Sequence, residues 1–320
     1  MDHYIFLAIG LAVIVIGAML LTDGAVALAE RLGMPEFIVG LTVVAVGTSM
    51  PELSVSVMSA VKGNSDMAIG NVVGSNIFNI YVILGLCAML SPIVFSQTNI
   101  RRDIPLCIFA SLMLGMFTLG GEVHPDWDNR ITRLEGAIML ATYISMIWVA
   151  LRAEKRRRAE SDYLAVTTDK PMPVWRLSAY IVVGLAALIF GGDMCVDNAS
   201  QIARRLGVRE SVIAITLVAG GTSLPELASS VAAVLKRRPS LALGNVLGSN
   251  IANILLILGT SSVITPLDLK GVALSDVWLS ILGSFLLLAS AVWIGRNRLT
   301  RVEGGVFVAI YVAYIATLLS

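Results

Sequence analysis

Long apolar segments, each bounded by charged or turn residues, recur along the whole chain. They fall at about residues 4–32, 35–61, 67–91, 103–120 and 133–151, and again at about 176–206, 209–235, 241–265, 274–294 and 303–319. An α-helix needs about 20 apolar residues to cross the hydrocarbon core of a bilayer. The pattern therefore predicts an all-α polytopic membrane protein with ten transmembrane helices, arranged as two sets of five.

The composition agrees with a membrane protein. Of the 320 residues, 57% are hydrophobic and 14% are charged, whereas a soluble domain is about 25% charged. This composition excludes a soluble globular enzyme, a disordered chain and a secreted disulfide scaffold. The formal net charge is +1, so no bulk field attracts nucleic acid and no nucleic-acid partner is expected.

Residues that commonly hold zinc or organise disulfides are scarce. The three cysteines lie inside apolar segments at spacings that suggest neither a disulfide framework nor a zinc site. Only two histidines are present, and there is no H-E-x-x-H motif. We therefore expect neither an enzyme nor a resident cofactor.

Residues 152–175 separate the two sets of helices and contain the basic run Lys155-Arg156-Arg157-Arg158. This composition is typical of a solvated linker. It divides the chain into a first five-helix repeat at 1–151, a basic cytoplasmic linker at 152–175 and a second repeat at 176–320. The first apolar segment lacks a basic region before it and is long enough to span, so it predicts a helix of the mature protein and not a cleaved signal.

Basic residues predict the orientation in the membrane. If the linker is cytoplasmic and the loops alternate, 16 of the 23 Lys and Arg residues lie on the cytoplasmic side and 7 on the other. Positively charged loops are retained in the cytoplasm. We therefore expect both termini to lie outside.

The two halves of the chain are similar in sequence. Gly47-Thr48-Ser49-Met50-Pro51-Glu52-Leu53 recurs 174 residues later as Gly221-Thr222-Ser223-Leu224-Pro225-Glu226-Leu227, and Gly70–Ile80 recurs at the same offset as Gly244–Ile254. Because five spans is an odd number, the second copy must enter the bilayer from the opposite side. Inverted-topology repeats of this kind are typical of transporters, with the binding site between the repeats.

Polar residues of both motifs fall at the middle of their spans. The midpoints of 35–61 and 209–235 are Thr48 and Thr222, and those of 67–91 and 241–265 are Asn79 and Asn253. All four clusters are therefore predicted near the bilayer centre, where polar residues usually serve a function.

Two glutamates in these motifs have two interpretations. Ser49-x-x-Glu52 and Ser223-x-x-Glu226 fit a capping box in which a helix restarts, with proline in its first turn. A capping box does not explain a carboxylate at mid-bilayer, where a charge costs about 2.5 kcal/mol or more. A helix broken at this depth also exposes carbonyls, which is tolerated where they line a cavity. We therefore favour cation coordination, with capping as a secondary role.

The chemistry of the predicted ligands points to hard cations. Carboxylates, hydroxyls and amide oxygens are present without sulfur or imidazole, which suits Ca²⁺ and Na⁺ and disfavours zinc or copper. The oxygens come from Glu52, Glu226, Thr48, Ser49, Thr222, Ser223, Asn79 and Asn253. Two glutamates supply the charge for one Ca²⁺ or two Na⁺.

Other features of the motifs have structural interpretations. The Gly-x-x-x-Gly spacing of Gly70 and Gly74, repeated in the second copy, also suits close helix packing. Asp23 and Asp197 are repeat partners near the ends of the first and sixth spans. They are predicted to be helix caps or interfacial charges and not ligands.

With these paired motifs the chain resembles the Na⁺/Ca²⁺ exchangers of the cation/Ca²⁺ antiporter superfamily, in their prokaryotic ten-helix form. The resemblance implies that helices 2, 3, 7 and 8 are broken and surround the ions, while helices 1 and 6 slide across them. It implies a location in the prokaryotic cell membrane and no obligate protein partner. It also implies ligands at Thr48, Ser49, Glu52, Ser75 and Asn79, at Thr222, Ser223, Glu226, Ser249 and Asn253, and at the carbonyls of Ala45, Val218 and Ala219.

One residue departs from the pattern of this family. Several members carry aspartate where this chain has Asn253. Two acidic ligands remain here instead of three, which bears on the number of ions exchanged.

The combined prediction is an antiporter that exchanges Na⁺ for Ca²⁺ by alternating access. A Ca²⁺/H⁺ exchanger and a K⁺-dependent Na⁺/Ca²⁺ exchanger are the nearest alternatives, because buried glutamates also carry protons. A passive cation channel is the alternative from another class. A pore is commonly lined by a symmetric ring of subunits, whereas here the repeats lie in one chain.

Overall fold

The computed structural model describes residues 2–118, 129–160, 172–207, 219–269 and 273–319. These residues are almost entirely helical and form two compact units, residues 1–48 with 146–248 and residues 49–145 with 249–320. Seven of the described helices are long and apolar enough to cross a membrane, or eight if the bent pair Glu36–Thr48 and Met50–Val61 is one span. The protein is therefore a multi-pass helical membrane protein.

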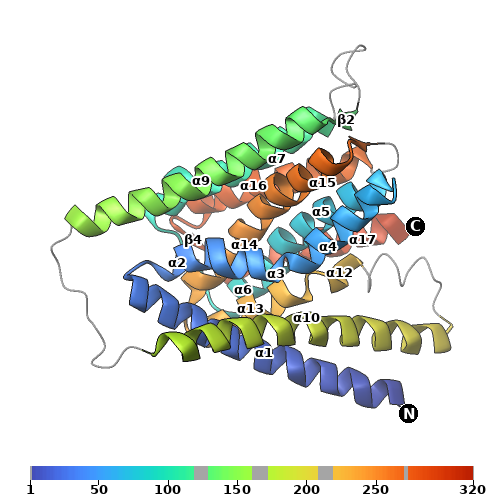
Figure 1. Ribbon diagram of the computed structural model, residues 1–320, viewed down its shortest axis with the longest axis horizontal. Helices are drawn as coiled ribbons and strands as arrows, with labels where there is room; N and C mark the ends of the chain where they lie inside the picture. Colours follow the sequence, from blue (N-terminus) through green and yellow to red (C-terminus); the bar gives the residue numbers. More distant parts are fainter. Residues whose placement is uncertain (1, 119–128, 161–171, 208–218, 270–272, 320) are drawn as a thin grey trace. The chain divides into compact units, whose positions relative to one another are not determined.

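The first unit contains the long helices α1 (Asp2–Leu32) and α10 (Val174–Arg205), which run side by side (Figure 1). It also contains α2 (Glu36–Val39), π-helical η1 (Gly40–Val44), α3 (Ala45–Thr48), α12 (Ala219–Gly221), α13 (Leu224–Leu235) and most of α14 (Pro239–Ile251). The end of α9 (Arg133–Glu160) completes it.

Helices α1 and α10 touch through their backbones at glycines. A Cβ atom on Gly17 would lie 2.9 Å from the Gly184 carbonyl oxygen, and one on Gly184 would lie 2.7 Å from the Leu21 nitrogen. Small residues that let two helix backbones approach this closely are a common device of membrane helices. Side chains therefore cannot interlock at this contact between the two helices.

A second backbone contact joins α2 and η1 to α14. A Cβ atom on Gly244 would lie 2.2 Å from the Phe37 carbonyl oxygen, and one on Gly248 would lie 2.5 Å from that of Leu41. The packing interpretation of the Gly-x-x-x-Gly spacing is thus confirmed in the second copy.

The second unit contains α4 (Met50–Val61), α5 (Ser65–Phe78), η2 (Asn79–Leu84), α6 (Gly85–Leu90), η3 (Asn99–Asp103) and α7 (Ile104–Thr118). Its later segments are η5 (Ala252–Leu258), α15 (Gly259–Ile264), α16 (Leu274–Ala289), η6 (Ser290–Ile294) and α17 (Arg301–Leu319). Two short antiparallel pairs join β1 (Ile93–Val94) to β4 (Arg298–Leu299) and β2 (Arg130–Ile131) to β3 (Leu267–Asp268).

The predicted break in helix 2 is present. Helix α3 ends at Thr48, α4 begins at Met50, and the two are bent by 47°. Helix α13 begins and ends 174 residues after α4, with the turn residues Thr222 and Ser223 before it. Proline in the first turn of α4 and of α13 explains the position of both starts, because proline is compatible there and not in a helix interior.

The predicted breaks in helices 3 and 8 are wrong. Ser65–Leu90 and Pro239–Ile264 are each one continuous helix. The polar motif passes into the π-helical segments η2 and η5, whose wider turns keep the backbone hydrogen-bonded. Neither stretch has an internal proline that would interrupt this pattern.

Burial separates core helices from peripheral ones. In Ser65–Leu90 and Pro239–Ile264, 78% and 94% of the most apolar stretch is buried, against 11% in Arg301–Leu318. The two helices that carry the Gly-Asn motifs are therefore core helices. The periphery is rich in exposed apolar side chains, such as Trp175 and Val302, as expected of a surface that faces lipid.

Several sequence predictions reach beyond the described residues. The predicted spans 103–120 and 209–235 include residues 119–120 and 209–218, so the count of ten remains a prediction. Helix α9 continues to Glu160, nine residues into the predicted linker, and residues 161–171 lie outside the described part.

Candidate ion-binding site

The two glutamates of the repeated motif occupy equivalent, fully buried positions. Glu52 in α4 and Glu226 in α13 are both 0% exposed, one in each compact unit. Ser49 and Ser223 are the N-caps of these helices, but neither makes a side-chain capping hydrogen bond in the described structure. Each carboxylate thus lies in the first turn of a helix that begins after a turn.

In the second unit the helix after the break is bonded to α5. The Ser75 hydroxyl donates to Glu52 Oε1 at 3.4 Å. The Asn71 amide donates to the Glu52 carbonyl oxygen at 3.2 Å and to Ser56 Oγ at 3.0 Å. The first turn of α4 is thus fixed to α5, and the carboxylate lies beside a second predicted ligand.

Four buried asparagines form a reciprocal network that we call the asparagine clasp: Asn76, Asn79, Asn250 and Asn253. The Asn76 amide donates to the Asn250 carbonyl oxygen at 3.2 Å, and the Asn250 amide donates to that of Asn76 at 3.3 Å. Asn79 donates to Asn250 Oδ1 at 2.9 Å, and Asn253 donates to Asn76 Oδ1 at 3.0 Å. Each side chain of one repeat is therefore bonded to the other repeat.

The clasp leaves buried oxygens available for a ligand. Among the described residues, Asn79 Oδ1, Asn253 Oδ1 and Ser249 Oγ are buried and have no hydrogen-bond partner. A buried acceptor without a donor costs about 1–3 kcal/mol. Neutral oxygens of this kind, together with the Glu52 carboxylate in the same unit, fit the preference of Ca²⁺ and Na⁺ for oxygen ligands.

The first unit holds the matching contacts of the other repeat. Asn245 is the repeat equivalent of Asn71, and its amide donates to the Glu226 carbonyl oxygen at 3.4 Å, to Ser229 Oγ at 3.0 Å and to Ser230 Oγ at 2.9 Å. Thr48 Oγ1 lies 3.3 Å from Asn245 Oδ1. The same hydroxyl lies 3.1 Å and 3.3 Å from the carbonyl oxygens of Val44 and Ala45, just before the break.

The predicted ligands thus fall into two groups, one in each unit. Glu52, Ser75, Asn79, Ser249 and Asn253 belong to the second unit. In the first unit, Thr48 contacts the Ala45 carbonyl, Ser223 is buried and Thr222 is half-buried. Val218 lies outside the described residues, and Ala219 is the first residue of α12.

Sequence reasoning missed four asparagines that organise these groups: Asn71, Asn76, Asn245 and Asn250. Each is an amide in a strongly apolar helix, where an unpaired amide is costly. This cost could have identified all four, whereas Asn79 and Asn253 were selected because they fall at the midpoints of their spans.

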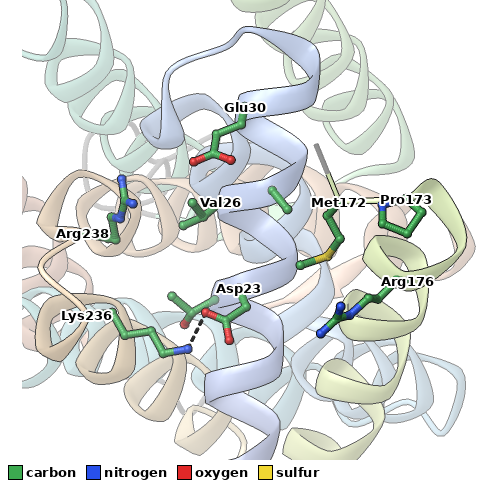
Figure 2. A pocket seen from close by; sticks show the side chains of 10 residues that line it. Asp23, Val26, Glu30, Met172, Pro173, Arg176, Lys236 and Arg238 are labelled. Carbon is green, nitrogen blue, oxygen red and sulfur yellow. Dashed lines mark hydrogen bonds and ion pairs between the residues drawn. The ribbon is translucent and has the colours of Figure 1, made fainter. Parts of the chain in front are cut away.

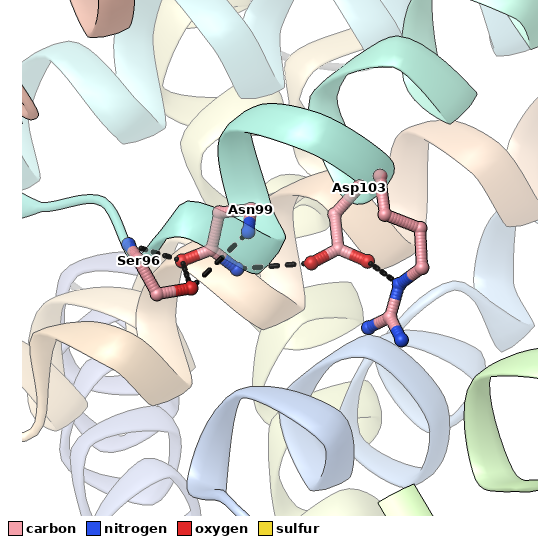
Figure 3. Close-up of polar contacts among 4 residues, drawn as sticks. Ser96, Asn99 and Asp103 are labelled. Atoms are coloured by element: carbon pink, nitrogen blue, oxygen red, sulfur yellow. Dashed lines mark hydrogen bonds and ion pairs between the residues drawn. The ribbon is translucent and has the colours of Figure 1, made fainter. Parts of the chain in front are cut away.

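Two other acidic side chains, outside the predicted ligand set, form ion pairs. At the end of η3, buried Asp103 accepts hydrogen bonds from Arg102 Nε at 2.8 Å and Asn99 Nδ2 at 3.0 Å, while the Ser96 backbone N–H donates to Asn99 Oδ1 (Figure 3). Asp23 is half exposed in a cavity of about 720 Å³ and pairs with Lys236 (Figure 2). Asp23 is thus engaged in an ion pair within the first unit.

Taken together, the apolar helices and their buried polar interior define a multi-pass membrane protein of the transporter class. The sequence profile of the sodium/calcium exchanger protein family matches residues 3–152 and 177–320. The chain therefore belongs to the sodium/calcium exchanger family, which confirms the resemblance seen in its motifs. The family consists of transporters and not of enzymes.

Full-length relatives and a solved structure support this assignment. A putative antiporter, CaxA of Alkalimonas amylolytica, is 34% identical over 315 residues, covering 97% of this chain and 96% of the relative. The sodium/calcium exchanger MaX1 of Methanosarcina acetivorans is 31% identical over 347 residues, covering 99% and 98%. A structure of the sodium–calcium exchanger NCX_Mj matches with a TM-score of 0.81 at 28% identity, covering 99% of both chains.

Proposed function

We propose that this protein is an antiporter that exchanges Na⁺ for Ca²⁺ by alternating access across the cell membrane. The observation that carries the proposal is the complete burial of Glu52 and Glu226 at repeat-equivalent positions. Glu52 is hydrogen-bonded to α5 and Glu226 to α14, and both of these helices carry neutral side-chain oxygens. Ionisable groups buried inside membrane helices commonly mark ion pathways.

The ligand set is an expectation of this proposal. The side-chain oxygens of Glu52, Glu226, Asn79 and Asn253 surround the ions, with the hydroxyls of Thr48, Ser49, Ser75, Thr222, Ser223 and Ser249. The carbonyls of Ala45, Val218 and Ala219 add backbone ligands. Neutral Asn253 leaves two acidic ligands, so one Ca²⁺ or two Na⁺ neutralise the site.

Charge balance explains why the two ions would exchange. One Ca²⁺ and a set of Na⁺ compete for the same two carboxylates, so each crossing carries one kind of ion. An occupied site is neutral, and helices close over it readily. Two bare carboxylates in an apolar environment oppose closure because their desolvation is costly.

Inverted repeats supply the two access states in this proposal. Helices 1 and 6, which are α1 and α10, move together across the ion-binding helices. The glycine contact of Gly17 with Gly184 favours a joint movement, because two backbones in contact form one rigid pair. Both termini face outside, and the partners are the ions and the lipid bilayer.

The coupling ion is tested by imposing one gradient at a time. Purified protein in proteoliposomes should take up radiolabelled Ca²⁺ when Na⁺ is loaded inside and absent outside. Uptake should saturate with Ca²⁺ and should require the internal counter-ion. A proton or potassium gradient alone should give uptake no greater than that of protein-free vesicles.

The alternatives predict different outcomes in the same vesicles. Uptake driven by the pH gradient alone would assign a Ca²⁺/H⁺ exchanger, and a requirement for K⁺ together with Na⁺ would assign a K⁺-dependent exchanger. Flux that does not saturate and needs no counter-ion would assign a channel. Each of these results would overturn the proposal that Na⁺ alone is exchanged for Ca²⁺.

A further inference from the structure

We propose that Asn76 and Asn250 are positioning residues that aim the amide oxygens of Asn253 and Asn79 at the transported ion. This inference rests on the proposed function, because it takes Asn79 and Asn253 as ion ligands. Asn76 and Asn250 themselves contact no ion in the proposal. They act through the asparagine clasp.

The hydrogen bonds of the clasp fix which end of each ligand amide faces the ion. The Nδ2 group of Asn79 is held by Asn250 Oδ1, and that of Asn253 is held by Asn76 Oδ1. An amide plane whose nitrogen is held presents its oxygen on the opposite side. These two oxygens are among the buried side-chain atoms for which the described structure shows no hydrogen-bond partner.

The positioning amides are themselves held on both sides. The Nδ2 group of Asn76 donates to the Asn250 backbone carbonyl oxygen at 3.2 Å, and that of Asn250 donates to the Asn76 carbonyl oxygen at 3.3 Å. Their Oδ1 atoms are therefore the only side-chain acceptors that they can offer to the ligand amides. All four residues are at most 1% exposed, so water does not compete for these bonds.

The hydrogen bonds of the clasp run from one repeat to the other. Asn76 of the first repeat holds Asn253 of the second, while Asn250 of the second repeat holds Asn79 of the first. Residues that orient metal ligands typically change metal affinity by about 10–100-fold when they are removed. Loss of Asn76 should therefore displace Asn253 of the opposite repeat and leave Asn79 in place. Loss of Asn250 should displace Asn79 and leave Asn253 in place.

The test is a set of double-mutant cycles on Na⁺-driven Ca²⁺ uptake by the full chain in proteoliposomes. Asn76→Ala should raise the half-saturating Ca²⁺ concentration by about tenfold, with a maximal rate within about twofold of the parent. Adding Asn253→Ala to Asn76→Ala should change little more, because that ligand is already misplaced. Adding Asn79→Ala should multiply the two effects, because the Asn79 amide is held by Asn250 and not by the Asn76 side chain.

The reciprocal cycle uses the other half of the clasp. Asn250→Ala should be coupled to Asn79→Ala and independent of Asn253→Ala. If Asn76→Ala fails to fold, this second cycle still tests the positioning role. Ser261→Ala is the matched control, because it removes a fully buried hydroxyl from α15 of the same unit that makes no hydrogen bond to the clasp in the described structure. It should leave the half-saturating concentration unchanged.

Two results would overturn the inference. One is an unchanged Ca²⁺ affinity in both Asn76→Ala and Asn250→Ala. The other is equal coupling of each variant to both ligands, as a general loss of packing would give. Glu52→Gln in the same vesicles separates this failure from that of the proposed function: if Glu52→Gln abolishes uptake while the clasp variants behave as the parent, only the positioning role is wrong.

Discussion

Replacing Glu52 or Glu226 by glutamine is expected to lower Na⁺-driven Ca²⁺ uptake by about 100-fold or more, which corresponds to about 2.7 kcal/mol. Glutamine keeps the size of the side chain and removes its charge. The remaining single carboxylate cannot neutralise Ca²⁺, and ligand charge is a main determinant of Ca²⁺ affinity. The two variants should be equally impaired, because the residues are equivalent in the repeat and both fully buried. Radiolabelled Ca²⁺ uptake into Na⁺-loaded vesicles measures the effect.

Controls separate lost binding from lost folding. A bound ligand raises the melting temperature of the folded protein, so Ca²⁺ should stabilise the parent in detergent and should not stabilise Glu52→Gln or Glu226→Gln. In the absence of Ca²⁺ all three should melt at similar temperatures. Asp23→Asn is the matched control, because its carboxylate is half exposed in an ion pair with Lys236, and it should keep full transport. Full transport by both glutamine variants would contradict the proposed site.

Gly244→Ala is expected to destabilise the protein by about 3 kcal/mol, at the upper end of overpacking effects. The added Cβ atom would lie 2.2 Å from the Phe37 carbonyl oxygen and 3.0 Å from the Leu41 nitrogen. Both atoms belong to backbone, so no side-chain rotation relieves the collision. The contact must open, which displaces α14 and with it Asn245, the residue that holds the first turn of the Glu226 helix. Thermal unfolding in detergent and Ca²⁺ uptake measure the two consequences.

Gly305→Ala is the comparison for this substitution. A Cβ atom on Gly305, which lies in α17, meets nothing within 4 Å among the described residues. Alanine is the better helix former by about 1 kcal/mol, so this variant should be as stable as the parent or more so. If Gly244→Ala were equally stable and active, the backbone contact between η1, α2 and α14 would not be required.

The sequence was sufficient to predict the helical membrane fold and the burial of two glutamates. Apolar periodicity and the 174-residue repeat do not depend on tertiary structure, and Glu52 and Glu226 are conspicuous because charges are rare inside apolar segments. Proline after Ser49 and Ser223 also located the restart of helices 2 and 7. For helices 3 and 8 the resemblance implied a break, but each carries its polar residues in one continuous helix. A π-helical turn accommodates them without a break.

The contacts between segments could not be predicted in this way. The asparagine clasp depends on which carbonyls and amides of α5, η2, α14 and η5 meet, and that is decided by packing. The glycine contact of α1 with α10 involves Gly17 and Gly184, which are 167 residues apart and lie outside the repeated motifs. Neither helix shows in its sequence which partner its glycines approach.

Equilibrium binding of radiolabelled Ca²⁺ to the purified protein tests most directly whether two glutamates, one from each repeat, share one ion. We expect one Ca²⁺ per chain, displaced by Na⁺ with a Hill coefficient above one, and a loss of this binding in Glu52→Gln and in Glu226→Gln alike. Two independent Ca²⁺ sites, each surviving the removal of the other glutamate, would contradict the account, and so would binding that Na⁺ does not displace.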